Sequence, residues 1–352
     1  ADAALRGDEF EYAVSGCRGA PYGTCRATVF GVAASGMSVA VHVDDFRPHV
    51  FFPAEDMPGD RVVQKLAAAI GARAEHLAWE HVRAAHFFGW EPSEDDPTRV
   101  REHRFVKVFF PSLYLFRKAA GVSDLRPVEG AIDPVTQFLD RTRLKACGWV
   151  TVSAPRYRAA GEFSTHTDLE VECSTEALAS TTPECDSVPP LVVLSYDIEC
   201  ISGTGAFPDP DNAADEVVFI GACVCRFGAD PSEWRRYMFC TGACDPVEGV
   251  DVRAYATERE MLRAYRDFVV LDVDPDVSLG YNTQNFDDWY LWKRAELLGV
   301  HTWKYSSRNV WEACRMQERD MGSTQTGPML MRRVLRQAVA RGLDVPQHGQ
   351  LG

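Results

Sequence analysis

The chain has 352 residues, of which 46% are hydrophobic and 25% are charged, and this ordinary globular composition excludes intrinsic disorder. Its 37 basic and 51 acidic residues give a formal charge of −14 (37 − 51), which argues against a protein that grips DNA through a broad basic surface. The same charge is compatible with a protein that handles nucleic acid through metal ions in a carboxylate-rich pocket. At roughly 150 residues per domain, the length predicts about two domains.

The chain lacks the signals of secretion or membrane insertion. No apolar run approaches the ~20 residues that a membrane helix needs, so we expect a soluble protein with no membrane partner. The sequence begins ADAALRGDEFEY, without a signal-peptide apolar segment or an initiator methionine, which suggests a fragment of a longer protein. Eleven cysteines without regular short spacing argue against a disulfide framework and favour a reducing compartment.

Four cysteines lie close together in the sequence and could ligate zinc. The usual C-x2-C spacing is absent, and the first two fall in the apolar stretch VVFIGACVCRF, where cysteine acts as a small hydrophobic residue. We therefore do not expect zinc in this chain. The four residues are Cys223, Cys225, Cys240 and Cys244.

The first half of the chain predicts strands and helices in mixed order. Asp133 followed by Pro134 is typical of an N-cap and a first helical turn. A Ser-, Thr- and Pro-rich stretch after residue 173 predicts a connection between domains, so we expect one domain over 1–186 and a second over 187–352. Strands are predicted over 22–53 (a β-meander), 103–110 and 168–173, and helices over 60–75, 109–121 and 131–145.

The second half predicts an α/β domain. The stretch LVVLSYDIEC is apolar on both faces until its carboxylates, and VVFIGACVCRF is a second such stretch, which is typical of central, covered strands. Thr257 as N-cap with Glu260 three residues later forms a capping box. Consecutive strands followed by alternating helix and strand are typical of α/β folds. Strands are predicted over 191–200, 217–227, 235–240 and 277–282, and helices over 257–269, from 286 onward, and over 329–342.

Two acidic residues at the end of the first of these strands carry the strongest chemical signal. Asp197 and Glu199 are two positions apart, so the period of a strand places both carboxylates on one face. Adjacent carboxylates repel each other unless a cation neutralises them, and hard oxygen ligands suit Mg²⁺ or Mn²⁺. A solvated and inert D-x-E at a strand end is the alternative.

A second acidic element, LGYNTQNFDDWYLWKRAELLG, covers residues 279–299. Asp287 lies at a loop-to-helix junction, where it or Asp288 could simply be an N-cap. The aromatic side chains around it are expected to be mostly packing residues, although such a loop could also stack on bases. They are Phe286, Trp289, Tyr290 and Trp292.

The order and separation of these elements resemble family B DNA polymerases. SYDIEC resembles the first exonuclease motif of that family, and GYNTQNFD resembles the second. Upstream, VFGVAASGMSVAVHVDDFRPHVFF and VEGAIDPVTQFLDRTRLKACGW resemble segments of the family's N-terminal part, and STHTDLEVECSTEAL resembles the approach to the first motif. The similarity covers most of residues 25–300 in the family's order. It is greatest to the eukaryotic delta type and its relatives in large DNA viruses.

This resemblance implies an α+β N-terminal domain followed by a 3′→5′ proofreading exonuclease on a ribonuclease-H-like fold. Asp197, Glu199 and Asp287 would be the catalytic metal ligands of a two-metal site holding Mg²⁺ or Mn²⁺. One metal would activate a water for in-line attack on the terminal phosphodiester, and the other would stabilise the leaving 3′ oxygen. Asn282 and Phe286 would shape the pocket for the terminal nucleotide, and Phe207 would stack on a base unless it is a buried packing residue.

The resemblance also implies partners and a location. The partners would be a DNA primer-template and its single-stranded 3′ end and, for the full-length parent, a processivity clamp and accessory subunits. The location would be the nucleus, or a viral replication site if the source is a virus.

The sequence departs from the family pattern in three respects. Trp289 stands where the family usually has proline. The third exonuclease motif, a Tyr followed four positions later by an Asp, does not occur, although the tail GLDVPQHGQLG resembles the segment before it. Polymerase motifs are absent, and Ser112-Leu113-Tyr114 only imitates one, because Phe109 stands where that motif requires a metal-binding Asp.

We therefore expect an N-terminal fragment of a replicative DNA polymerase that carries most of an exonuclease domain, truncated at its C-terminus, with severely reduced nuclease activity by itself. Two alternatives are a stand-alone 3′→5′ exonuclease and a non-catalytic module that binds DNA strands.

Overall fold

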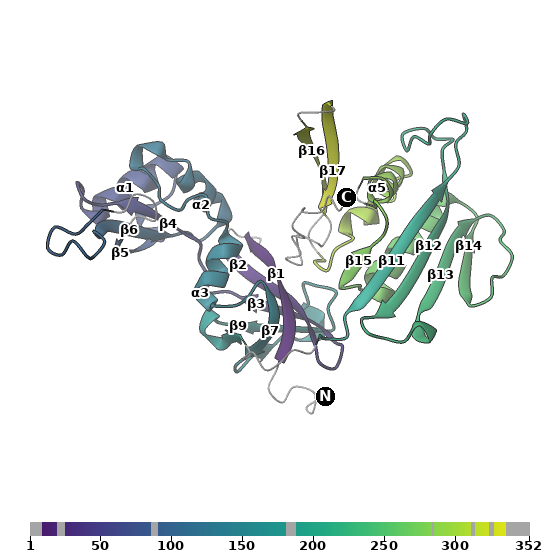
Figure 1. Cartoon of the computed structure of the whole chain (residues 1–352), viewed down its shortest axis with the longest axis horizontal. Helices are drawn as coiled ribbons and strands as arrows, with labels where there is room; N and C mark the ends of the chain where they lie inside the picture. The colour runs from purple at the N-terminus through teal and green to yellow at the C-terminus, as the bar shows by residue number, and fades with distance from the viewer. Residues whose placement is uncertain are drawn as a thin grey trace.

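The computed structural model of the chain describes residues 9–19, 25–85, 91–180, 188–283, 285–310, 314–323 and 327–335. Sheets of seven, five, three and two strands, with few helices, give a mixed α/β architecture, which confirms the predicted class (Figure 1). Within these ranges, no helix is both long and apolar enough to cross a membrane.

The strands are β1 (Glu9–Gly19), β2 (Cys25–Ala33), β3 (Ser38–Val43), β4 (His49–Pro53), β5 (Ala78–Ala84), β6 (His103–Phe109), β7 (Cys147–Val152), β8 (Arg156–Tyr157), β9 (Leu169–Cys173), β10 (Leu178–Ser180), β11 (Val192–Cys200), β12 (Val217–Arg226), β13 (Arg235–Thr241), β14 (Val250–Tyr255), β15 (Val277–Leu279), β16 (Arg315–Ser323) and β17 (Gly327–Leu335). The α-helices are α1 (Gly59–Ile70), α2 (Leu113–Ala120), α3 (Pro134–Thr142), α4 (Glu258–Asp267) and α5 (Asp287–Leu297). A π-helical turn, η6 (Phe268–Val273), continues α4, and a 3₁₀ helix, η7 (His301–Tyr305), follows α5.

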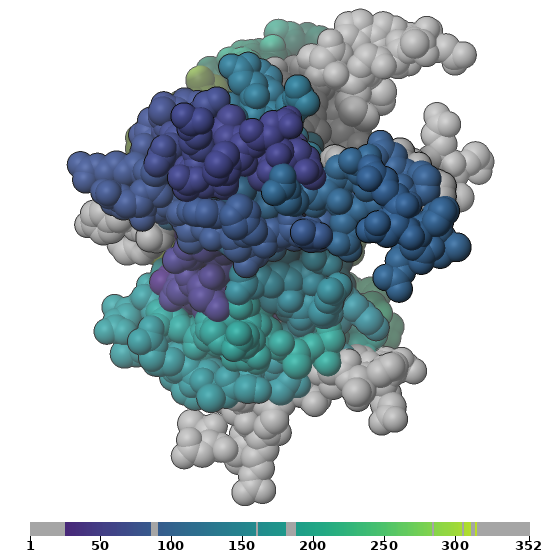
Figure 2. Space-filling model, turned by 90° about the vertical axis from the view of Figure 1, so that its left-hand side faces the viewer, coloured from purple at the N-terminus to yellow at the C-terminus, as the bar shows by residue number. Residues whose placement is uncertain are grey.

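The first half of the chain builds two sheets with separate cores. The seven-stranded sheet has the order β10-β7-β1-β2-β3-β9-β8 and packs against α3, whereas β4, β6 and β5 form a small sheet covered by α1 and α2. From the end of the molecule seen in Figure 2, the blue residues of the small sheet and its helices lie above the teal residues, around 130–180, of the larger one. The single meander predicted over 22–53 is therefore wrong at β4, which pairs with β6 because Val50 and Phe52 bury their side chains in the core of the small sheet.

The second half builds the five-stranded sheet, in the order β14-β13-β12-β11-β15. Strand β11 pairs antiparallel with β12 and parallel with β15, and helices α4 and α5 contribute to the core on one face of this sheet. Before its carboxylates β11 is covered as predicted, since Val192 to Tyr196 are buried or half-buried. The prediction was wrong for β12, where the second face is partly open and Phe219 is 38% exposed. The expected boundary at residue 186 stays a prediction. Strand β10 ends at Ser180, β11 begins at Val192, and 181–187 lie outside the described residues.

Helix starts follow the predicted capping chemistry. The Asp133 carboxylate accepts a hydrogen bond from the Val135 N–H ahead of α3, and the Thr257 hydroxyl accepts one from the Glu260 N–H ahead of α4. The helix predicted over 329–342 was wrong as far as residue 335, because this segment forms β17 and pairs antiparallel with β16. Residues 336–352, including the tail GLDVPQHGQLG, lie outside the described residues.

Candidate active site

The two carboxylates of the first motif lie side by side on β11. Tyr196 and Ile198 point into the core, whereas Asp197 and Glu199 are both exposed on the opposite face, which confirms the predicted alternation. Opposite them on β12 are Gly221 and Phe219, in register. The acidic pair thus lies on the partly open face of the sheet, where a substrate has room to approach.

Asp287 is joined directly to β11 by a hydrogen bond. It is the first residue of α5 and only 2% exposed, and its Oδ1 accepts from the backbone N–H of Ile198 at 3.2 Å. Asp288 instead accepts from the Tyr196 hydroxyl at 2.5 Å. The N-cap reading of both aspartates was therefore wrong, because Phe286 occupies the cap position without a side-chain hydrogen bond and both carboxylates turn towards β11.

The surroundings of Asp287 disfavour its charged form. Burial first, and then the neighbouring Asp197 carboxylate, outweigh the hydrogen bonds from backbone N–H groups and raise the pKa of this carboxyl from 3.8 to about 6. Two acids from motifs 90 positions apart therefore face each other, one exposed on β11 and the other buried at the start of α5. Either a shared proton or a bound cation relieves their repulsion.

The donor chemistry suits a divalent cation. Among the residues that the structure describes, no group of three or more His, Cys, Asp or Glu side chains is arranged to hold a metal ion. The pair of Asp197 and Asp287 nevertheless fits one, since hard carboxylate oxygens suit such an ion and a doubly charged cation would relieve the repulsion between the two side chains. Glu199 lies on the same face of β11 as Asp197 but does not complete such a group.

The cysteines considered for zinc have other contacts. Cys240 is buried and its thiol donates to the Arg253 carbonyl at 3.8 Å, while the Cys244 thiol contacts its neighbour's carbonyl at 3.4 Å. Cys223 and Cys225 are half-buried on β12.

A tight turn delivers Asp287 to the strand. Gly280 is the first residue after β15, and it packs so closely against β11 that an added Cβ would lie 2.5 Å from the Tyr196 carbonyl oxygen. Asn282 adopts a left-handed backbone conformation (φ 56°), which asparagine tolerates, and its carbonyl accepts from the N–H of Phe286 at 3.2 Å. Asn282 is thus a turn-forming residue next to the carboxylates.

Replacing Gly280 by alanine should destabilise the chain by about 1–3 kcal/mol, because the new methyl group would press on the backbone of β11 and on Thr283. Chemical denaturation measures this loss. Gly221→Ala on the neighbouring strand is the matched control, since its added Cβ would meet nothing within 4 Å. Equal stability losses in the two variants would contradict the prediction.

Aromatic rings lie beside the turn. Phe207 is 79% exposed, so buried packing does not explain it, and its ring lies edge-on to that of Phe286 at 5.5 Å. Tyr290 and Trp292 are buried and pack in the core, as expected. Sequence reasoning missed Tyr281, which is almost fully exposed in the same turn. An aromatic side chain in a turn directly before Asn282 was the available signal.

Sequence reasoning also missed the residues that hold the Phe207 loop, residues 201–216. Asp215 is buried and accepts from the N–H groups of Gly203 and Asp209, both at 2.8 Å. Arg294 of α5 donates to the Asn212 carbonyl at 2.7 Å and pairs with Glu258 of α4. No periodicity or motif marks these contacts, because they join parts of the chain that meet only in the folded molecule.

Comparison with known proteins identifies related sequences. A family model described as DNA polymerase family B, exonuclease domain, matches residues 126–333. The DNA polymerase delta catalytic subunit of Bos taurus is 29% identical over 320 residues, which are 85% of this chain and 28% of that protein. The corresponding subunit of Glycine max is 35% identical over 324 residues, 85% of this chain and 29% of that protein.

The chain therefore spans less than a third of these relatives. A structure of the family B DNA polymerase from the hyperthermophilic archaeon Pyrobaculum calidifontis matches with a TM-score of 0.60 and 23% identity, covering 87% of this chain and 34% of that one. This likeness concerns the fold.

Proposed function

Since this chain belongs to the family B DNA polymerases and matches their exonuclease domain, we propose that it is the N-terminal part of a replicative DNA polymerase and carries most of its 3′→5′ proofreading exonuclease. The observation that carries this proposal is the meeting of Asp197 and Asp287, one from each motif, across β11 and α5. We propose an N-terminal domain over 1–186 and the exonuclease domain over 187–352.

The family implies a divalent-metal-dependent nuclease, and we propose Mg²⁺ or Mn²⁺ as the ion. Asp197 and Asp287 would hold it, with Glu199 as a further ligand from the same face of β11. When bound, such ions activate a water for attack on the terminal phosphodiester and stabilise the leaving 3′ oxygen.

The surrounding residues would bind the DNA end. Phe207 and Phe286 would stack on the terminal bases of a single-stranded 3′ end. Such stacking suits a proofreading site because it tolerates any base. Asn282 would shape the pocket by holding the turn beneath them. For the full-length protein we propose a primer-template, a processivity clamp and accessory subunits as partners. We also propose nuclear localisation, or a viral replication site for a viral source.

Mn²⁺ titration of the chain tests the site. The wild-type chain should bind Mn²⁺, and Asp197→Ala should abolish this binding because it removes the carboxylate that faces the buried Asp287 and leaves Glu199 without its neighbour on β11. Asp251→Ala, which removes an exposed carboxylate from β14 of the same sheet, should bind as the wild type does. Binding that survives Asp197→Ala would contradict the proposed site and would favour a non-catalytic strand-binding module.

A further inference from the structure

A short ladder of hydrogen bonds joins the seven-stranded sheet to the nuclease half. The loop between β8 and β9 pairs with the segment after η7 through an antiparallel bridge between Thr165 and Asn309. The His166 N–H donates to the Arg308 carbonyl at 2.7 Å, and the Val310 N–H donates to the Ser164 carbonyl at 3.0 Å. The backbones of the two halves are thus paired directly.

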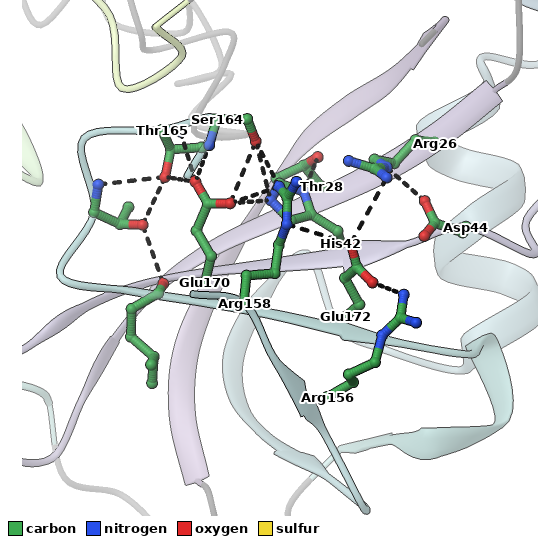
Figure 3. Close-up of polar contacts among 12 residues, drawn as sticks. Arg26, Thr28, His42, Asp44, Arg156, Arg158, Ser164, Thr165, Glu170 and Glu172 are labelled. Carbon is green, nitrogen blue, oxygen red and sulfur yellow. Dashed lines mark hydrogen bonds and ion pairs between the residues drawn. The ribbon is translucent and has the colours of Figure 1, made fainter. Parts of the chain in front are cut away.

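Glu170 of β9 fixes the N-terminal side of this ladder. It is 0% exposed, and one carboxylate oxygen accepts from the N–H groups of Ser164 and Thr165 at 2.7 and 2.6 Å, as Figure 3 shows. The other oxygen pairs with Arg158 at 2.8 Å and with His42 at 3.1 Å. A fully buried carboxylate is tolerated only with such a complete set of donors, so the loop backbone and this side chain stabilise each other.

Arg308 fixes the nuclease side. Its side chain is buried, with Nε donating to Asp274 at 2.7 Å and the terminal nitrogen donating to Asp276 at 2.7 Å. The other oxygen of Asp276 accepts from the N–H of Val192 at 2.8 Å, and the Asp276 N–H donates to the Val192 carbonyl at the same distance. Val192 is the first residue of β11, the strand that carries Asp197 and Glu199.

We propose that Arg308 is a positioning residue for β11, and that Glu170, by holding the loop that pairs with residues 308–310, links the N-terminal sheet to the same strand. The planar fork of an arginine can bind two carboxylates and place its own backbone at once, which a lysine cannot do. Catalytic carboxylates must be held within about 0.5 Å of their productive geometry, so a strand anchored at its start from both halves suits this task. The consequence for catalysis rests on the proposed function, whereas the mechanical coupling does not.

Hydrogen exchange of the whole 352-residue chain tests the coupling. Arg308→Met should accelerate exchange of the Val192 and His166 amides by about tenfold or more, because the link between them is lost. Glu170→Gln should accelerate exchange at Ser164 and Thr165 and also at Val310 and Val192. The matched control is Glu172→Gln, on the same strand and face, which pairs with arginines and should leave Val192 unchanged.

Two further measurements keep the proposal falsifiable. Arg308→Lys retains the charge without the fork and should give intermediate exchange at Val192, so it decides the matter if Arg308→Met does not fold. Mn²⁺ affinity should fall in Arg308→Met, partly recover in Arg308→Lys, and remain at the wild-type value in Glu172→Gln.

Exchange at Val192 that is unchanged in both arginine variants would overturn the role of Arg308, and acceleration confined to Ser164 and Thr165 would overturn that of Glu170. If Asp197→Ala binds Mn²⁺ as the wild type does, the proposed metal site fails. The exchange pattern would still decide whether the N-terminal sheet and β11 are coupled.

Discussion

Replacing Arg294 by methionine should lower the free energy of unfolding by about 3–5 kcal/mol, the largest stability effect that we expect in this chain. The guanidinium is buried between α5 and α4 and pairs with Glu258 at 2.8 and 2.5 Å. It also donates to the Asn212 carbonyl at 2.7 Å. Without it, Glu258 would be a buried carboxylate without its cation, and the carbonyls of the Phe207 loop would lose their donor.

Urea denaturation of the chain measures this effect. The adjacent Lys293, whose ammonium lies 3.5 Å from an exposed Asp211, is the matched control, and Lys293→Met should cost no more than about 1 kcal/mol. Combining Arg294→Met with Glu258→Met should recover part of the loss, since an apolar pair needs no counter-charge. A similar loss of stability in Arg294→Met and Lys293→Met would refute the role assigned to Arg294.

Acid should remove a second large contribution to the free energy of unfolding, that of the buried Glu170 carboxylate. Burial by itself would raise the pKa of this carboxyl, but hydrogen bonds from His42 and Thr165 outweigh it and lower the pKa from 4.5 to about 2. Because the folded-state pKa lies below the unfolded-state value, the stabilisation is fully present above about pH 4.5 and is lost as the pH falls towards 2. The expected contribution is on the order of 2–3 kcal/mol. Arg158 and His42 are the charged or titratable groups that face it.

The pH dependence of unfolding in the wild type and in Glu170→Gln measures this contribution. The two stabilities should differ most at neutral pH and converge between about pH 4.5 and pH 2, because glutamine has no proton to gain. A difference that stays constant over this range would show that Glu170 acts through packing and not through its charge.

Local chemistry made much of the fold predictable. Helix caps depend on neighbouring residues, and both Asp133 and Thr257 accept the hydrogen bonds expected of N-caps. Errors arose where pairing partners were distant in sequence. Strand β4 was expected to continue the meander, but its partner β6 begins at residue 103. The strand β17 was expected to be helical, and only its pairing with β16 reveals its conformation.

What the sequence by itself determined is the chemistry of the site: the two motifs, their order, and the common face of Asp197 and Glu199, which follows from the period of a strand. Only the tertiary structure decided that Asp287 is buried against Ile198 and faces Asp197, because the turn from Gly280 must pass close to β11. It alone decided that Glu170 and Arg308 are joined through backbone pairing. Contacts between residues more than eighty positions apart depend on how sheets and loops pack, and no local pattern of residues encodes that packing.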